Sequence, residues 1–173
     1  MALAIALKMN DKIFLGSERK WRYWPNKWDG FIKVHNFYIA IKNPLYHFII
    51  SEFKDKIVIQ NIESIKMVDL LFQNIQEVIE TSKIESISQW RRYDVEMIAC
   101  SKSHIWNLCN SGSIMEHDFS AISENTWARE SVTWYISTIN QIDQNKKKSP
   151  KKILKDMLTR YSESGWKIKI IEL

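Results

Sequence analysis

The side chains best suited to chemistry in this 173-residue chain are two cysteines and four histidines. The histidines are His35, His47, His104 and His117. They lack the short, regular spacing of metal ligands, so we expect no metal and no cofactor. Cys100 and Cys109 form no Cys-x-x-Cys pair and cannot build a disulfide framework. We interpret both cysteines as small buried apolar residues.

A second candidate for function is a segment rich in aromatic and basic residues. Its aromatic members are Trp21, Tyr23, Trp24 and Trp28, interleaved with Arg19, Lys20, Arg22 and Lys27. The segment Trp90-Arg91-Arg92-Tyr93 repeats the pattern. Rings that stack on bases beside cations that neutralise phosphates are typical of single-strand nucleic-acid binding. The same composition is also typical of protein interfaces, and this second interpretation is the one we favour.

Composition limits the class of protein. Apolar residues make up 45% of the chain and charged residues 26%, which is typical of a globular protein. The net charge of +5 is modest for a nucleic-acid binder, and much of it lies in a lysine run at 146–155 that we interpret as a solvated helix entrance. No apolar stretch is long enough to span a membrane, and Met1–Leu7 lacks the charged start of a signal peptide. We expect a cytoplasmic protein with one domain over residues 1–173.

These candidate residues must be positioned by alternating groups of strands and helices. In the first half, the sequence predicts hairpins at 4–16 and 31–41, with turns at Asn10-Asp11 and His35-Asn36. Residues 19–29 read as a loop. Leu45–Phe53 favours a short helix, and apolar residues from Ile65 to Ile79 recur at helical spacing.

The second half repeats this order. It predicts strands at 95–100, 105–109 and 119–122, a helix carrying Trp127 and Trp134, a helix starting at Ser149-Pro150, and a final strand at 166–170. The whole chain therefore predicts an α+β domain of antiparallel sheets covered by helices.

This order and spacing resemble the proteasome β-subunit family, which includes the bacterial peptidase HslV and short proteasome-like proteins of bacteria and phages. The resemblance is carried by Ala4–Leu7 with Ile13–Glu18, by Phe37–Ile41, by Glu96–Leu108, by Phe119–Ser123 and by Trp127-Ala128. It covers nearly the whole chain. It implies a four-layer αββα sandwich, the Ntn-hydrolase fold, in which two antiparallel sheets lie between two layers of helices.

The resemblance also implies where a catalytic site would lie. The family uses an N-terminal Thr, Ser or Cys as nucleophile, an acid at the end of the second strand, a lysine, and a glycine-serine turn. Glu18 stands in the acid position, and counting back from it places Ala2 at the nucleophile position. The lysine position aligns with Gly30, with Lys27 and Lys33 close enough to leave the assignment open. The turn has become Ser123-Glu124-Asn125.

From these substitutions we expect a pseudoenzyme with no catalytic residues, because alanine has no atom that can attack a carbonyl. The resemblance implies a structural or interaction subunit of a homo- or hetero-oligomeric assembly, for which a phage particle is one setting. Single-strand nucleic-acid binding is the alternative, and an active peptidase or amidase is the least favoured. The interface candidates are Trp21, Tyr23, Trp24, Trp28, Trp90, Arg91 and Arg92. Whether the tryptophans near residue 24 plug the former cleft or dock a neighbour stays open.

Overall fold

The computed structural model of the chain describes residues 3–18, 30–58, 64–81, 96–108, 113–123, 126–142, 149–161 and 168–173. The strands in these ranges are β1 (Leu3–Met9), β2 (Lys12–Glu18), β3 (Ile32–Val34), β4 (Phe37–Ile41), β5 (Met97–Cys100), β6 (Ile105–Leu108), β7 (Ile114–Glu116), β8 (Phe119–Ser123) and β9 (Ile168–Glu172). The helices are α1 (Pro44–Phe53), α2 (Ile65–Thr81), α3 (Thr126–Ile142) and α4 (Pro150–Tyr161), with a 3-10 turn, η1 (Lys54–Lys56), after α1.

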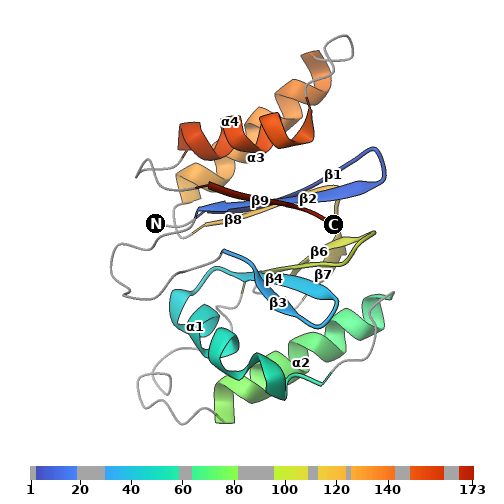
Figure 1. Ribbon diagram of the computed structural model, residues 1–173, viewed down its shortest axis with the longest axis vertical. Coiled ribbons are helices and arrows are strands. Elements are labelled where there is room, and N and C mark those ends of the chain that lie inside the picture. The colour runs from blue at the N-terminus through green and yellow to red at the C-terminus, as the bar shows by residue number, and fades with distance from the viewer. Residues whose placement is uncertain are drawn as a thin grey trace.

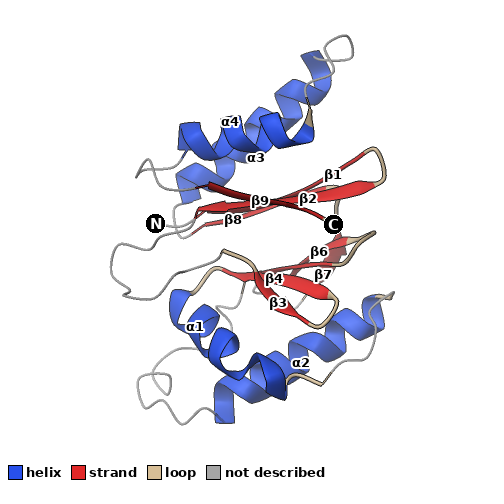
Figure 2. Cartoon of the chain, viewed as in Figure 1, coloured by secondary structure: helices blue, strands red, loops and turns tan. Residues whose placement is uncertain are grey.

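The strands form two antiparallel sheets that lie face to face (Figure 1). One sheet has the order β8-β1-β2-β9, and the other has the order β3-β4-β5-β6-β7. Helices α3 and α4 cover the outer face of the four-stranded sheet, while α1 and α2 cover the five-stranded one (Figure 2). The expected α+β fold, a four-layer αββα sandwich, is therefore confirmed. No helix among the described residues is both long and apolar enough to span a membrane.

Tight turns give the sandwich two distinct ends. Asn10 and Asp11 both have positive φ, which suits a two-residue turn between β1 and β2 and confirms the predicted hairpin. Lys8 N donates to Asp118 O and His117 N donates to Ile105 O, so the turn at 101–104, which directly precedes Ile105, lies at this same end. The turn at 35–36 lies there too, because Tyr38 pairs with Cys100. We call this end the hairpin end. The opposite end, where β2 stops at Glu18 and β8 stops at Ser123, is the Glu18 end.

Side chains cap the first turns of two helices, and one of these caps, at Ser149, is predicted by the sequence. The Asn43 side chain caps α1 by accepting hydrogen bonds from Leu45 N at 2.9 Å and Tyr46 N at 3.4 Å. The Ser149 hydroxyl oxygen accepts from Lys152 N at 3.3 Å, and Pro150 occupies the first position of α4. Both predicted helices are thus confirmed at their first turns.

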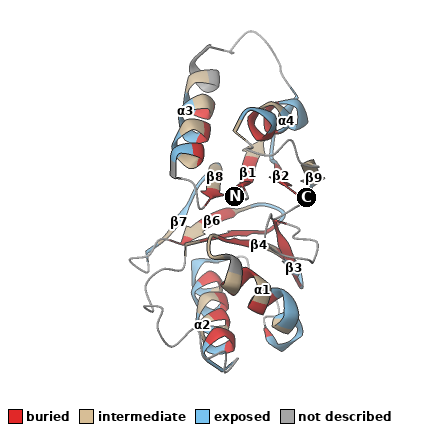
Figure 3. Ribbon diagram, turned by 90° about the vertical axis from the view of Figure 1, so that its left-hand side faces the viewer, coloured by how far each residue is buried: buried red, intermediate tan, exposed pale blue. Residues whose placement is uncertain are grey.

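Three apolar layers hold the sandwich together (Figure 3). One layer joins the five-stranded sheet to α1 and α2, and a second joins the four-stranded sheet to α3 and α4. The layer between the sheets contains small side chains, among them Ala4, Ala6 and Ala40. Small residues on facing strands let the two sheets approach closely. The strands β1 and β2 are therefore packed on one face against the other sheet and on the other face against α3 and α4.

Glycine at position 16 has a specific packing role in β2. A Cβ atom built there would lie 2.9 Å from Cδ1 of Leu158 and 3.4 Å from Cδ2 of Leu154, both on α4. These leucines are fully buried, so they have little room to move. Gly16 therefore allows α4 to pack directly onto β2.

The structure corrects two details of the sequence prediction. Strand β7 was not predicted, because its three residues are only partly buried or exposed and carry no apolar pattern. Ile65 was counted in the apolar stripe of α2, but it is exposed because it occupies the first residue of the helix. The rest of the stripe, from Val68 through Ile79, is buried as predicted, except that Phe72 is only partly buried.

Candidate functional site

The Glu18 end is built by the last residues of β2 and β8 around the first residue of β1. In the register of the sheet, Leu3 is opposite Ser123 and Ala4 is opposite Ser17. Position 2 directly precedes Leu3, but Ala2 itself lies outside the described residues, as do Glu124 and Asn125. Of the positions that the family resemblance selects, Glu18, Gly30 and Ser123 are described.

Polar side chains at this end are enclosed by protein. Glu18 is 0% exposed, and Ser17 and Ser123 are almost as completely buried. A buried carboxylate is stable only where surrounding groups interact with it, and neither Glu18 nor Ser123 is without such an interaction. Neither serine side chain is therefore accessible to a peptide from solvent.

Gly30 occupies the position where the family resemblance implies a lysine. Its φ is 45°, in the left-handed region that disfavours every residue with a Cβ atom. The local backbone is therefore shaped for glycine, and a lysine would be strained there.

The sequence analysis left open that Lys33 serves as that lysine, but the structure places Lys33 at the hairpin end, away from Glu18. It pairs with Tyr38 across the β3–β4 hairpin and lines a pocket that also includes Leu173. Leu173 directly follows β9 at the hairpin end, whereas Glu18 pairs with Ile168 at the other end of that strand. We therefore do not assign the lysine position to Lys33. Lys27 lies outside the described residues.

Cys100 confirms the interpretation that the sequence gives for it. It is fully buried between the sheets, and that burial raises the pKa of its thiol far above the usual range. A protonated, enclosed thiol is neither a nucleophile nor a metal ligand. Cys109 lies outside the described residues. Among the residues that the structure describes, no group of three or more acidic, histidine or cysteine side chains could hold a metal ion.

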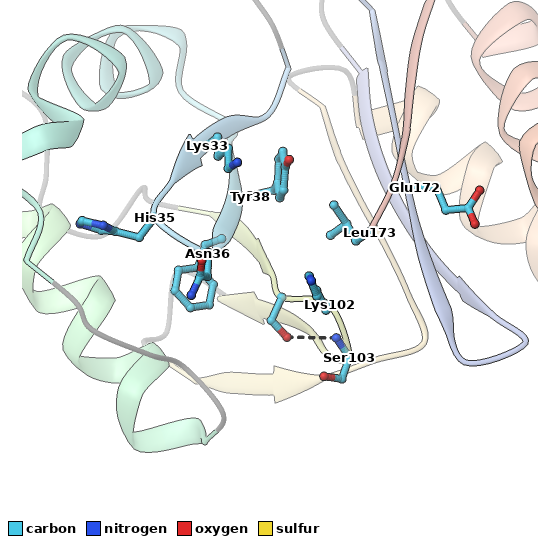
Figure 4. A pocket seen from close by; sticks show the side chains of 10 residues that line it. Lys33, His35, Asn36, Tyr38, Lys102, Ser103, Glu172 and Leu173 are labelled. Atoms are coloured by element: carbon cyan, nitrogen blue, oxygen red, sulfur yellow. Dashed lines mark hydrogen bonds between the residues drawn. The ribbon is translucent and has the colours of Figure 1, made fainter.

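The hairpin end contains an open pocket of about 520 Å³ (Figure 4). It lies between the β3–β4 hairpin, the turn after β5 and the last residues of β9. The lining residues are Lys33, His35, Asn36, Phe37, Tyr38, Ser101, Lys102, Ser103, Glu172 and Leu173. The sequence analysis did not select this region, because its residues come from three distant segments.

Hydrogen bonds fix the two turns that border the pocket. The Ser101 hydroxyl oxygen accepts from Ser103 N at 3.3 Å and from His104 N at 3.1 Å. His35 Nε2 donates to Ile57 O at 2.8 Å, which turns its ring away from the pocket. Figure 4 shows Lys33 and Tyr38 next to each other on one side of Leu173, with Lys102 on the other.

One carboxylate lies at the edge of this pocket, and it is already paired. Glu172 accepts from Lys12 Nζ at 2.7 Å and from Lys151 Nζ at 2.8 Å. These two hydrogen bonds, Lys12 first, lower the pKa of Glu172 to about 2. Figure 4 shows the Glu172 side chain directed away from Lys33 and Lys102.

The predicted interface residues cannot be placed. Trp21, Tyr23, Trp24 and Trp28 lie outside the described residues, as do Trp90, Arg91 and Arg92. Two other tryptophans, Trp127 and Trp134, are 64% and 68% exposed on α3. Sequence periodicity places them on one face of a helix, seven residues apart, although the interface prediction did not include them.

No protein-family model and no curated protein matches the chain. In fold it is similar to a solved structure of Thiobacillus denitrificans BPH in complex with epoxomicin, with a TM-score of 0.75 and 8% identity, covering 100% of this chain and 98% of that one. It is also similar to Thiobacillus denitrificans BPH alone, with a TM-score of 0.75 and 9% identity, over 100% of this chain and 97% of that one. At these identities the similarity is one of fold.

Proposed function

We propose that this chain is a non-catalytic relative of the proteasome β-subunits that serves as a structural or interaction component of an oligomeric assembly. One observation carries the proposal: alanine occupies position 2, where the family has its nucleophile. The register of β1 and β2 supports the count, because six residue pairs from Ala4↔Ser17 to Met9↔Lys12 connect the acid position to the start of β1 without a break.

Two further positions support the loss of catalysis. Gly30 replaces the lysine in a backbone conformation that favours glycine. The sequence after β8 reads Ser123-Glu124-Asn125 where the family has a small glycine-serine turn. Restoring threonine at position 2 alone would therefore leave the site incomplete.

The exposed face of α3 supports a role in assembly. Trp127 and Trp134 present two indoles on one helix face, and soluble monomers seldom leave such an apolar patch uncovered. Tryptophan is also enriched in the energetically dominant centres of protein interfaces. The cellular setting, whether cytoplasm or a phage particle in an infected cell, is part of this proposal and rests on resemblance alone.

The oligomeric state in solution tests the assembly. We expect sedimentation velocity to give a species larger than the 20.6 kDa monomer. Replacing Trp134 by alanine should dissociate it and leave a folded subunit, as should at least one of Trp21→Ala, Trp24→Ala and Trp28→Ala. Trp106→Ala is the matched control, because this buried indole should lower thermal stability instead. A wild-type monomer at all concentrations would contradict the proposal.

Catalysis is tested separately. We expect no turnover of peptide-amide substrates above the buffer blank, for the wild type and for Ala2→Thr. Epoxomicin is the matched probe, because it is bound in one of the similar structures. Intact-mass measurement after incubation should show no covalent adduct, since alanine offers no attacking atom. Turnover that is abolished by changing a serine or threonine would make the chain a peptidase or amidase.

Single-strand nucleic-acid binding through residues 19–28 is the competing outcome. If it operates, affinity for a single-stranded oligonucleotide should fall steeply with salt and be lost in Trp21→Ala. We expect weak binding without that dependence, because a net charge of +5 is modest for a nucleic-acid-binding protein.

A further inference from the structure

The hairpin-end pocket has the size of a small-molecule site. Its volume of about 520 Å³ lies within the range of roughly 300–1,000 Å³ that is usual for ligand pockets. A single inorganic anion would occupy only a fraction of this space. The volume therefore favours a ligand with an organic part.

The pocket has two lysine side chains, Lys33 and Lys102, that form no ion pair within the described ranges. Glu172 is the carboxylate at its edge, but Lys12 and Lys151 already hold that group at 2.7 and 2.8 Å. Two ammonium groups are thus available for an anion.

The hydrogen-bond donors in the pocket favour a phosphate over a carboxylate. Figure 4 shows the Tyr38 hydroxyl beside Lys33, and this hydroxyl has no hydrogen-bond partner among the described residues. Lysines act as point charges with several donors, which suits the many acceptor oxygens and double charge of a phosphate monoester.

The remaining walls provide apolar surface for the organic part of a ligand. The Tyr38 ring and the Leu173 side chain project into the pocket between the two lysines. An aromatic or sugar-like group could pack here while its phosphate contacts Lys33 and Lys102.

We propose that the hairpin-end pocket binds a small organic phosphate monoester through Lys33, Lys102 and the Tyr38 hydroxyl. The proposal is independent of the proposed function, because the pocket and the positions of the lost catalytic site lie at opposite ends of the sandwich.

The experiment is a titration of the full chain with four probes, followed by calorimetry or by amide chemical shifts. Phenyl phosphate combines the charge with a ring, inorganic phosphate lacks the ring, benzoate replaces phosphate by carboxylate, and benzyl alcohol lacks the charge. We expect saturable binding that is tightest for phenyl phosphate and that weakens with added salt. Shift changes should centre on residues 33–38 and 101–103.

Variants assign the contacts. Lys33→Met and Lys102→Met should each weaken phenyl phosphate binding by about tenfold, the usual effect of losing a hydrogen bond to a charged group. Tyr38→Phe should weaken it less, because a neutral donor is lost. Lys66→Met is the matched control, since this exposed lysine lies on α2, away from the pocket. All these substituted side chains are exposed or partly exposed, so we expect the variants to fold.

Specific results would overturn the proposal. If phenyl phosphate showed no saturable binding, the pocket would not be a binding site for phosphate monoesters. If benzoate bound as tightly as phenyl phosphate, the proposed preference for phosphate over carboxylate would be wrong. If inorganic phosphate bound as tightly, the proposed contact with the organic part of the ligand would be wrong. Binding that survives the double variant of Lys33 and Lys102 would place the ligand elsewhere. None of these results depends on whether the chain forms an oligomer or hydrolyses peptides.

Discussion

The two ends of the sandwich differ in how far their polar side chains are exposed to solvent. At the Glu18 end, Glu18, Ser17 and Ser123 are buried by the protein that surrounds them. At the hairpin end, Lys33, Lys102 and the Tyr38 hydroxyl line an open pocket. In the resembling family the first end would carry the chemistry. Among the residues that the structure describes, the polar side chains at that end are buried like a core, while the end that the resemblance does not select has accessible charged side chains.

The largest effect on stability is expected from replacing a leucine by alanine at the Glu18 end, compared with the same replacement at the hairpin end. Leu3 is 1% exposed at the Glu18 end, so Leu3→Ala should lower the free energy of unfolding by about 2–5 kcal/mol. Leu173 is only partly buried at the pocket, so Leu173→Ala should cost less than half as much. Chemical denaturation measures both. Equal losses would mean that the two ends are equally packed.

Introducing the family's lysine at the Glu18 end should destabilise the fold rather than repair a site. With φ at 45°, we expect Gly30→Lys to cost roughly 1–2 kcal/mol, the usual penalty for a side chain in the left-handed region. Gly30→Asn is the control, because asparagine tolerates this region better and should cost less. If Gly30→Lys were as stable as the wild type, the backbone would not be the obstacle to a lysine.

Two carboxylates, each bridging two cations, extend the comparison. Glu96 contacts Lys42 at 3.2 Å and Arg129 at 3.0 Å, and so connects β5 to α3 across the layers. Its side chain is only 20% exposed, so we expect Glu96→Gln to cost about 1 kcal/mol. The loss should be partly reproduced by Arg129→Met, and unfolding in urea measures both. If the urea midpoint of unfolding did not change in these variants, the ion pairs of Glu96 would contribute nothing measurable to stability.

Glu172 should have the smallest effect, and that effect should depend on pH. Its pKa is lowered from 4.5 to about 2 by Lys12 and Lys151, so its contribution to stability is present above about pH 4.5 and is lost as the pH falls towards 2. We expect the stability difference between wild type and Glu172→Gln to shrink over that window. A difference that stays constant from pH 5 to pH 2 would contradict the pairing.

Much of the fold was predictable, because its signals are local. The Asn10-Asp11 turn, the Ser149-Pro150 helix start and the apolar stripe from Val68 to Ile79 each depend on residues close together in the sequence. β7 escaped prediction because three mostly exposed residues carry no periodicity. It is held by backbone pairing to β6, which the sequence does not display.

The candidate sites were less predictable. The family resemblance selected Glu18 and Gly30 by counting along strands, but it gave no sign that Glu18 is fully enclosed or that Gly30 has positive φ. The pocket was missed because Lys33 and Lys102 line the same pocket only once β3, β4 and β5 have paired. Alternation within the hairpin could have indicated that Lys33 and Tyr38 share a face.

The order of strands in the two sheets has a consequence for synthesis of the chain. The five-stranded sheet is contiguous, because β3 to β7 all come from residues 32–116. The four-stranded sheet joins the first hairpin to β8 and β9, so β2 has no partner on its outer side until residues 168–172 are made. We therefore expect the five-stranded sheet to form first on the ribosome. During that interval β2 is an unprotected apolar edge, which makes the first hairpin the part of the nascent chain most exposed to aggregation.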